Sequence, residues 1–338
     1  MDKDKLRNLA KSLVASGKGI LAADESTMTM KKRLSSVGVE SNPETNRVYR
    51  QILFTTPGIE EFISGVILFD ETIKQKSDEG IPFSNLLKEK GVVPGIKVDK
   101  GTVDFENFPG EKITEGLDGL RERLKDYKSL GAEFTKWRAV FSIGVDKPTD
   151  VCIETNCESL ARFAGLSQEA DLLPIVEPEV LMDGDHSLEK CEEVTNKVLE
   201  LLFKKLRDHR IDLAGILLKP NMVIAGKESL KKPSSFEVAE ATLRCFESLI
   251  PEELPGIVFL SGGQSPFEAT ENLNEINKIK KIDCEFSFSF GRALQEPVLK
   301  AWQGKRENIK SAQSAFYKRA KLNSLARRGE YRKEMENE

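Results

Sequence analysis

The chain has 338 residues, of which 39% are hydrophobic and 31% are charged, and its formal net charge is −4. This composition is typical of globular proteins and excludes the collagen-like and intrinsically disordered classes. The weak negative charge gives no general attraction to nucleic acid or to anionic membranes, so we expect neither as a partner. Any phosphate group must therefore be bound by cations that are placed locally.

The sequence also indicates where the protein resides. No apolar run approaches the roughly 20 residues that span a bilayer, and the N-terminus lacks the hydrophobic core of a secretory signal. The five cysteines are scattered along the chain without a CxxC pair. Such usage is typical of reduced thiols, so we expect a cytoplasmic protein.

The chain begins with an amphipathic pattern. Leu6, Leu9, Leu13 and Val14 recur at helical spacing, which predicts a helix that lies on the fold. Eight short β-rich runs follow, separated by segments with helical periodicity and charged outer faces. In chain order the runs are GKGILAADES, FISGVILFDE, GVVPGIKVDK, AEFTKWRAVF, DLLPIVEPEV, LAGILLKPNMV, GIVFLSGGQS and CEFSFSFGRAL.

This alternation predicts the fold. Each run is almost continuously apolar, which is typical of parallel strands that are covered on both faces. Eight such strands alternating with helices favour a closed (β/α)8 TIM barrel, in a single domain over residues 1–338. A doubly wound open sheet is the rival, and it is disfavoured because no GxGxxG turn follows the first run. The charged segment from about residue 318 is expected to be a helix with a partly mobile end.

The two histidines give no sign of a metal site. His186 lies in the polar sequence DGDH and His209 in the charged segment KKLRDHR, so both are expected to be solvated at the surface. A catalytic zinc site usually takes two or three histidine ligands. We therefore expect no metal, and no other cofactor is indicated.

Charged residues stand at the ends of several predicted strands. In a (β/α)8 barrel the active site lies at the carboxyl ends of the strands, and side chains at positions i and i+2 share a face. These charges predict a charged cup at one end of the barrel; the alternative is that ion pairs only keep the barrel mouth soluble. The residues are Asp24, Lys97, Asp99, Lys136, Arg138, Glu177, Glu179, Lys219 and Arg292.

Such a cup suits imine chemistry. A lysine held in low dielectric beside other cations loses its proton more easily, and the free amine can attack a carbonyl to form a Schiff base. Lys219 is the preferred nucleophile because its run, AGILLKPN, is the most apolar before the lysine. Lys136 is the alternative, although the neighbouring Arg138 suggests an anion-binding role. Carboxylates on the other strand ends can move the protons that the reaction requires.

Two groups of residues suit phosphate. Ser261 and Gly262 come directly after the strand predicted in the seventh run, and Arg292 comes just past the strand predicted in the eighth; barrels often bind phosphate at these places. Two separated phosphate sites would suit a ligand phosphorylated at both ends, but Lys32 and Arg33 could instead form a solvated helix face. The members of the second cationic group are Lys32, Arg33, Lys97 and Arg138.

These segments resemble a known family. GILAADES, GIKVDKG, KWR, PIVEPE, LLKPNMV, FLSGGQS and FSFGRAL have the order and spacing of class I fructose-1,6-bisphosphate aldolase, from about Gly17 to near Tyr331. The resemblance implies reversible cleavage of fructose 1,6-bisphosphate to dihydroxyacetone phosphate and glyceraldehyde 3-phosphate through a lysine Schiff base. It also implies a place in glycolysis and gluconeogenesis, a homotetramer, and no need for a metal.

The resemblance implies a role for each site residue. Lys219 would form the Schiff base with the ketose carbonyl, and Glu177 would be the acid and base in forming and dehydrating the carbinolamine. Asp24 would act at the hydroxyl that loses its proton on cleavage. Lys136 would stabilise developing charge, and Glu179 would hold the lysines in position. The phosphate nearest the ketone would be held by Ser261, Gly262, Gly291 and Arg292. The other phosphate would be held by Ser26, Arg33, Lys97 and Arg138.

Two departures from the family pattern leave alternatives open. Animal members end in a tyrosine that protonates the bound carbanion, whereas the last tyrosine here is Tyr331, so another group or water would protonate it. Met28 stands where the family has a glycine and would reshape the distal phosphate pocket. A second hypothesis for the enzyme keeps the imine chemistry with another substrate, such as a shorter ketose 1-phosphate or a seven-carbon bisphosphate. A third hypothesis for the function is a non-enzymatic phosphosugar-binding protein. It is disfavoured because binding alone does not require a lysine that forms an imine.

Overall fold

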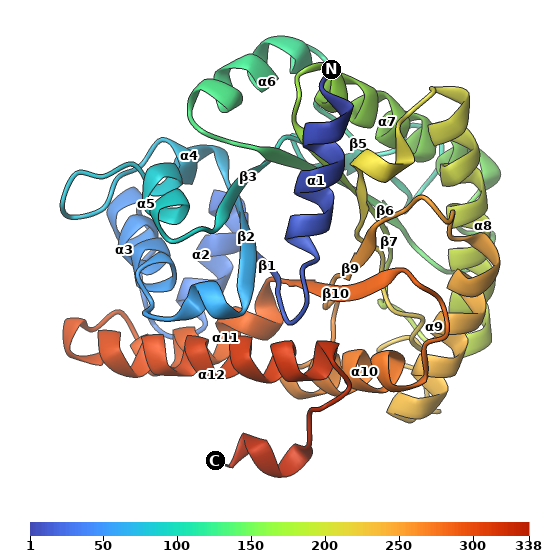
Figure 1. Ribbon diagram of the computed structural model, residues 1–338. Helices are drawn as coiled ribbons and strands as arrows, with labels where there is room; N and C mark the ends of the chain where they lie inside the picture. The colour runs from blue at the N-terminus through green and yellow to red at the C-terminus, as the bar shows by residue number, and fades with distance from the viewer. Residues whose placement is uncertain (338) are drawn as a thin grey trace.

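The structure is a computed structural model, and it describes residues 1–337. Eight parallel strands close into a barrel in the order β1-β10-β9-β8-β7-β6-β3-β2 (Figure 1). Each predicted run contains one of them, so the (β/α)8 prediction is confirmed and the open-sheet alternative was wrong. The strands are β1 (Gly19–Ala23), β2 (Ile63–Leu68), β3 (Val93–Lys97), β6 (Phe134–Phe141), β7 (Leu173–Val180), β8 (Leu217–Leu218), β9 (Gly256–Phe259) and β10 (Glu285–Phe290).

Burial on both faces explains the composition of the strands. Every residue of β1, β2 and β7 is buried, as their apolar runs predicted. The parallel register sets Lys97 beside Lys136 and Arg138 beside Glu177. Because all eight strands run in the same direction, these charged residues meet at the carboxyl end of the barrel.

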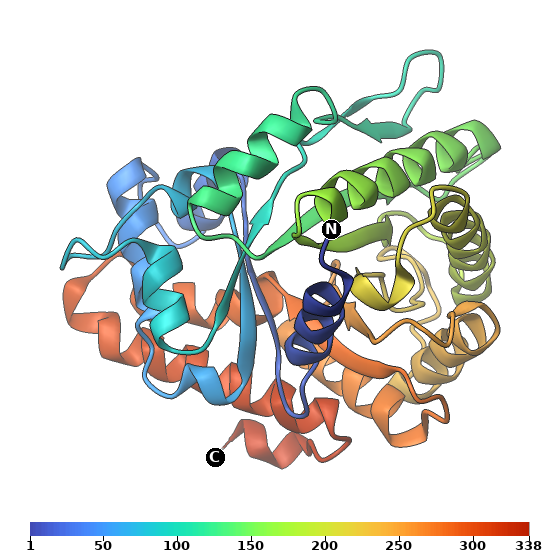
Figure 2. The same cartoon turned by 45° about the horizontal axis from the view of Figure 1, so that its top comes forward.

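Helices surround the barrel on its outer side (Figure 2). Ser234 and Ser265 each form a capping box with the glutamate three residues later, which fixes the starts of α9 and α10. No helix within residues 1–337 is long and apolar enough to cross a membrane. The helices are α1 (Lys3–Leu13), α2 (Thr27–Ser35), α3 (Pro43–Phe54), α4 (Asp70–Ile73), α5 (Phe83–Glu89), α6 (Leu120–Ser129), α7 (Asp150–Glu169), α8 (Leu188–Asp208), α9 (Ser235–Leu249), α10 (Pro266–Ile279), α11 (Arg292–Trp302) and α12 (Ile309–Arg327).

Helix α1 closes the amino-terminal end of the barrel, so the predicted N-terminal helix is confirmed. Its buried residues Leu6 and Leu13 share a cluster with Phe134 and Leu173, which open β6 and β7. The Ser64 hydroxyl, near the start of β2, donates to the Leu13 carbonyl at 2.5 Å. The apolar face of α1 therefore covers the end opposite the charged residues.

A short hairpin was not predicted. Strands β4 (Thr102–Asp104) and β5 (Lys112–Thr114) pair in antiparallel fashion between β3 and β6. Three residues a strand are too few for an alternating pattern to be recognised. The Thr114 hydroxyl donates to the backbone carbonyl of Arg138 at 2.7 Å, so the hairpin supports the end of β6 that carries Arg138.

The segment after α12 packs against the outer helix α10. The Tyr331 N–H donates to the Asn274 side chain at 2.9 Å, and Lys333 pairs with Glu271 at 2.7 Å. Tyr331 is buried, and its hydroxyl donates to Glu336 at 3.0 Å. Tyr331 therefore lies away from the charged end of the barrel. The partial mobility expected of this segment stays a prediction.

Candidate active site

A cavity of about 1270 Å³ lies at the carboxyl ends of the barrel strands. All the site residues proposed from the sequence except Lys32 line it, together with Asp99, so charged residues from several strand ends meet in one cavity. These residues are Asp24, Ser26, Arg33, Lys97, Lys136, Arg138, Glu177, Glu179, Lys219, Ser261, Gly262, Gly291 and Arg292.

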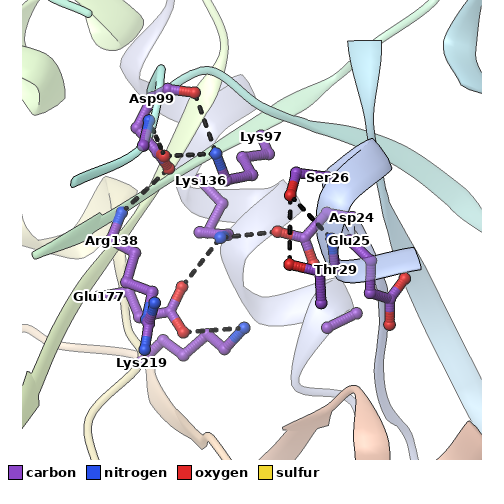
Figure 3. A network of polar contacts seen from close by, with 12 residues as sticks. Asp24, Glu25, Ser26, Thr29, Lys97, Asp99, Lys136, Arg138, Glu177 and Lys219 are labelled. Carbon is purple, nitrogen blue, oxygen red and sulfur yellow. Dashed lines mark hydrogen bonds and ion pairs between the residues drawn. The ribbon is translucent and has the colours of Figure 1, made fainter. Parts of the chain in front are cut away.

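Two lysines and two carboxylates form a chain of ion pairs in this cavity (Figure 3). Glu177 joins the lysines: its Oε1 lies 3.3 Å from Nζ of Lys219, and its Oε2 lies 3.1 Å from Nζ of Lys136. Asp24 Oδ2 lies 2.6 Å from the same Lys136 nitrogen. The four side chains are between 3% and 12% exposed. Charges this buried persist because they neutralise one another.

Neighbouring charges set the ionisation states of Asp24, Glu177 and Lys136. Burial alone would raise the pKa of Asp24 and of Glu177, but the Lys136 and Lys219 ammonium groups hold both pKa values below their usual range. Burial alone would lower the pKa of Lys136, but Asp24 and Glu177 raise it well above its usual value. Both carboxylates are therefore ionised at neutral pH, and Lys136 is a fixed ammonium group.

The sequence LLKPN fixes where Lys219 enters the cavity. The Lys219 N–H donates to the Val176 carbonyl at 2.8 Å and so continues the pairing of β8 with β7. Pro220 then has no N–H with which to extend the ladder. The side chain of Asn221 takes over and accepts the Val180 N–H at 2.9 Å. The lysine backbone is thus held on both sides by hydrogen bonds to β7.

Two further ion pairs line the side of the cavity formed by β3, β6 and β7. Lys97 pairs with Asp99, and its Nζ also donates to the Asp99 carbonyl at 3.0 Å. Arg138 pairs with Glu179, and burial, which alone would lower the pKa of Arg138, is outweighed by Glu179, which raises it. Glu179 was expected to hold the lysines in position. Its ion pair is with Arg138 instead, and Glu177 is the carboxylate that contacts both lysines.

The loops after β9 and β10 meet at one end of the cavity. Arg292 Nη2 donates to the Gly262 carbonyl at 3.1 Å, which joins the two loops that were expected to bind phosphate. Gly262 has φ of +53°, a backbone conformation that favours glycine. Gly291 directly precedes α11 without a side-chain cap. The N–H groups at the start of this helix and the Arg292 guanidinium make this end suitable for an anion.

The start of α2 forms the other end of the cavity. The Ser26 side chain caps α2, and Arg33 lies two turns further along. Arg33 is 23% exposed at its side chain and lines the cavity, whereas Lys32 is exposed and does not line it. The solvated-face alternative is therefore right for Lys32 and wrong for Arg33. Met28 is 76% exposed and lines the cavity between these groups and solvent.

Sequence reasoning missed polar residues that face or support the cavity. Ser289 near the end of β10 lines it, and within residues 1–337 its buried hydroxyl has no hydrogen-bond partner. The alternation in FSFSFG, which places Ser289 and Gly291 on one face, was the available signal. Glu25 also lines the cavity and pairs with Arg33. Its position next to Asp24 was the signal that could have found it.

The histidines and cysteines lie outside this site. His209 is at the surface and contacts Glu158 at 2.8 Å, as expected. His186 was expected to be solvated as well, but it is buried and both ring nitrogens lack partners in the described chain. The DGDH loop packs against the segment after Asn221, where Gly226 N–H donates to the His186 carbonyl at 2.8 Å, and this covers the ring. All five cysteines are buried and free, as predicted for reduced thiols.

Known proteins resemble this chain over nearly its whole length. The family model for class I fructose-bisphosphate aldolase matches residues 5–338. A probable class 1 fructose-bisphosphate aldolase of Xanthomonas campestris pv. campestris is 50% identical, over 98% of this chain and 100% of that protein. A cytosolic fructose-bisphosphate aldolase of Arabidopsis thaliana is 54% identical over 94% of this chain and 88% of its own length.

A solved structure agrees with these matches. Fructose-bisphosphate aldolase from Plasmodium falciparum, in a complex with TRAP and a small-molecule inhibitor, superposes with a TM-score of 0.96 at 49% identity. The match covers 98% of this chain and 96% of that one. Fold, site and relatives agree, and the chain belongs to the class I fructose-bisphosphate aldolase family, whose members are lyases.

Proposed function

We propose that this protein cleaves fructose 1,6-bisphosphate reversibly to dihydroxyacetone phosphate and glyceraldehyde 3-phosphate, with Lys219 as the nucleophile. The observation that carries the assignment is the difference between the two buried lysines. Lys136 contacts two carboxylates and is fixed as an ammonium group, whereas Lys219 contacts Glu177 at the longer distance of 3.3 Å. Lys219 is therefore held by one carboxylate where Lys136 is held by two, and we assign the attack on the carbonyl to Lys219.

The first step is imine formation. Glu177 takes a proton from Lys219, and the free amine nitrogen attacks the ketose C2 to give a carbinolamine. Glu177 then returns a proton to the C2 hydroxyl, which leaves as water, and the C2–nitrogen double bond forms. The ionised Glu177 carboxylate beside both lysines suits this exchange, because it accepts the first proton as a base and returns it as an acid, which regenerates the carboxylate.

The second step breaks the carbon–carbon bond. Asp24 takes the proton of the C4 hydroxyl, the C3–C4 bond breaks, and its electron pair moves toward the iminium to give an enamine. The Lys136 ammonium group, 2.6 Å from Asp24, stabilises the negative charge that develops on oxygen. Tyr331 does not line the cavity, so the proton that the enamine needs comes from another group or from water.

The two ends of the cavity suit the two phosphates. We assign the phosphate nearest the ketone to the β9 and β10 loops and the other phosphate to the start of α2 with the cations on β3 and β6. Backbone N–H groups and forked guanidinium groups are the usual ligands of phosphate in proteins. The residues assigned to the first site are Ser261, Gly262, Gly291 and Arg292. The residues assigned to the second site are Ser26, Arg33, Lys97 and Arg138.

We also propose that the protein is cytoplasmic and a homotetramer. The cytosolic relative in Arabidopsis thaliana supports the location, and the resemblance to the family supports the assembly. Light scattering on the purified protein tests the assembly, and a mass near four times 37.8 kDa is expected. A mass near 37.8 kDa would contradict it.

A single substitution tests the proposed chemistry. Lys219→Arg keeps the positive charge but cannot form an imine, so kcat/KM for fructose 1,6-bisphosphate cleavage should fall by at least about 10³-fold. Lys32→Arg, on the exposed face of α2, is the matched control and should stay within about twofold of the parent, the usual outcome at such a site. Activity of Lys219→Arg near that of the parent would show that the nucleophile is another residue.

A further inference from the structure

A buried cluster of charges lies behind the distal end of the cavity. Asp24 and Glu25 are adjacent, and their side chains point in opposite directions from the end of β1, Asp24 toward Lys136 and Glu25 away from it (Figure 3). The Glu25 side chain is 4% exposed. It is met by side chains from three different helices: Arg33 from α2, Arg50 from α3 and Gln295 from α11.

The contacts to Glu25 are close: its Oε1 accepts hydrogen bonds from Arg33 and Gln295, and its Oε2 forms an ion pair with Arg50 but has no hydrogen-bond partner in the described chain. Arg50 Nη2 lies 2.5 Å from Oε2, and Gln295 Nε2 donates to Oε1 at 2.7 Å. Arg33 Nη1 shares Oε1. Arg50 also donates to the Gln295 side-chain oxygen at 3.3 Å. Arg33, Arg50 and Gln295 thus all contact the Glu25 carboxylate, and Arg50 and Gln295 also contact each other.

The charges of the cluster do not cancel. One carboxylate faces two guanidinium groups, so the cluster carries one net positive charge. Burial alone would raise the pKa of Glu25, but Arg33 and Arg50 hold it below its usual range, so the carboxylate stays ionised. Arg50 is 2% exposed at its side chain and cannot reach a ligand, whereas Arg33 is 23% exposed and lines the cavity. Because Arg33 and Arg50 share the single charge of Glu25, one positive charge remains, and only Arg33 can present it to an anion in the cavity.

The cluster also connects the end of β1 with α2 and α11. Gln295 Nε2 donates to the Ala22 carbonyl at 2.8 Å, close to the end of β1 that carries Asp24. Gln295 lies one turn after Arg292 at the start of α11. A Cβ placed on Gly291 would lie 3.7 Å from Arg33 Nη2. The cluster therefore fixes the position of the Arg33 guanidinium relative to both β1 and α11.

We propose that Arg50 is a positioning residue that sets the charge and orientation of Arg33 for the phosphate remote from the ketone. The proposal rests on the assignment of Arg33 to that phosphate under the proposed function. Arg50 itself touches no substrate. Its effect should therefore depend on whether the substrate carries the remote phosphate.

Two substrates separate positioning from a merely structural role. Fructose 1-phosphate has the ketone and its phosphate but lacks the remote phosphate. Arg50→Met leaves Glu25 and Arg33 as a neutral pair. We expect KM for fructose 1,6-bisphosphate to rise at least about tenfold, because an anion loses the attraction of a net cation. Both kcat and KM for fructose 1-phosphate should stay within about twofold.

Controls keep the test independent of folding. Arg47→Met removes surface ion pairs from the same helix and should change neither substrate's kinetics. Arg50→Lys keeps the positive charge but lacks the forked guanidinium group. The rise in KM for fructose 1,6-bisphosphate should then be only about threefold. This variant carries the test if Arg50→Met does not fold, since a selective rise supports the proposal and its absence overturns it.

Two outcomes separate the inference from the proposed function. An equal loss on both substrates in the Arg50 variants, with the parent preferring the bisphosphate, would overturn the positioning role and leave the proposed function intact. A parent protein that cleaves neither substrate, or that shows no preference for the second phosphate, would instead contradict the proposed function or its assignment of Arg33.

Discussion

The roles of the two buried lysines follow from the carboxylates that each one meets. The sequence placed Lys219 and Lys136 at strand ends and favoured Lys219 because its strand is the more apolar. The sequence could not show that Glu177 contacts both lysines. That contact depends on the register of β7 with β6 on one side and with β8 on the other. The ion pair of Glu179 is with Arg138, whereas the family resemblance had implied that Glu179 holds the lysines in position.

These ion pairs make folding stability depend on pH. In the folded protein the pKa values of Asp24 and Glu177 are lowered. They therefore add stability above the unfolded values of about 4 to 4.5, and this stability is lost as the pH falls below that range. In Lys136→Met both carboxylates lose their main cation, and their contribution at neutral pH is lost.

Urea unfolding of the parent and of Lys136→Met from pH 7 to pH 3 measures this effect. The difference in unfolding free energy between the two proteins should be largest at pH 7 and should shrink as the pH falls toward 3. A difference in unfolding free energy that does not depend on pH would contradict the assigned ionisation of Asp24 and Glu177.

Among the elements, α1 was the best predicted, because its apolar spacing repeats over three turns. The β4–β5 hairpin was missed because strands of three residues carry no periodic signal. His186 was misplaced for a related reason: polar neighbours such as Asp183 and Asp185 predict a solvated loop, and its burial depends on packing against the distant segment after Asn221. Long elements with a periodic apolar pattern can thus be predicted from the sequence, whereas the burial of loops that pack on other loops cannot.

The cap formed by α1 should matter for stability and not for catalysis. Leu13 is fully buried against the barrel end, so Leu13→Ala should lower the free energy of unfolding by about 2–5 kcal/mol. Because α1 lies at the end opposite the cavity, kcat/KM of the folded variant should stay within about twofold of the parent.

Lys11→Ala on the exposed side of the same helix is the control, and its effect should stay within about 0.5 kcal/mol. Denaturant unfolding and a standard cleavage assay measure both properties. If Leu13→Ala is as stable as Lys11→Ala, α1 is not a structural cap.

At the scale of the whole molecule, barrel closure brings together residues that no local pattern connects. The strand-end residues could be predicted because a (β/α)8 barrel places every strand end at one rim. Arg50 and Gln295 could not, since they lie in the middle of helical patterns and meet Glu25 only when α3 and α11 pack beside the end of β1. The supporting charges of a site are therefore harder to predict than the residues that face it.

The central claim is that Lys219 forms the covalent bond to the substrate. It is tested most directly by adding borohydride to the whole protein in the presence of dihydroxyacetone phosphate, followed by peptide mapping by mass spectrometry. Reduction of the imine should leave one stable adduct per chain, on Lys219, and none should form in Lys219→Arg. An adduct on Lys136, or no adduct in an active protein, would contradict the mechanism.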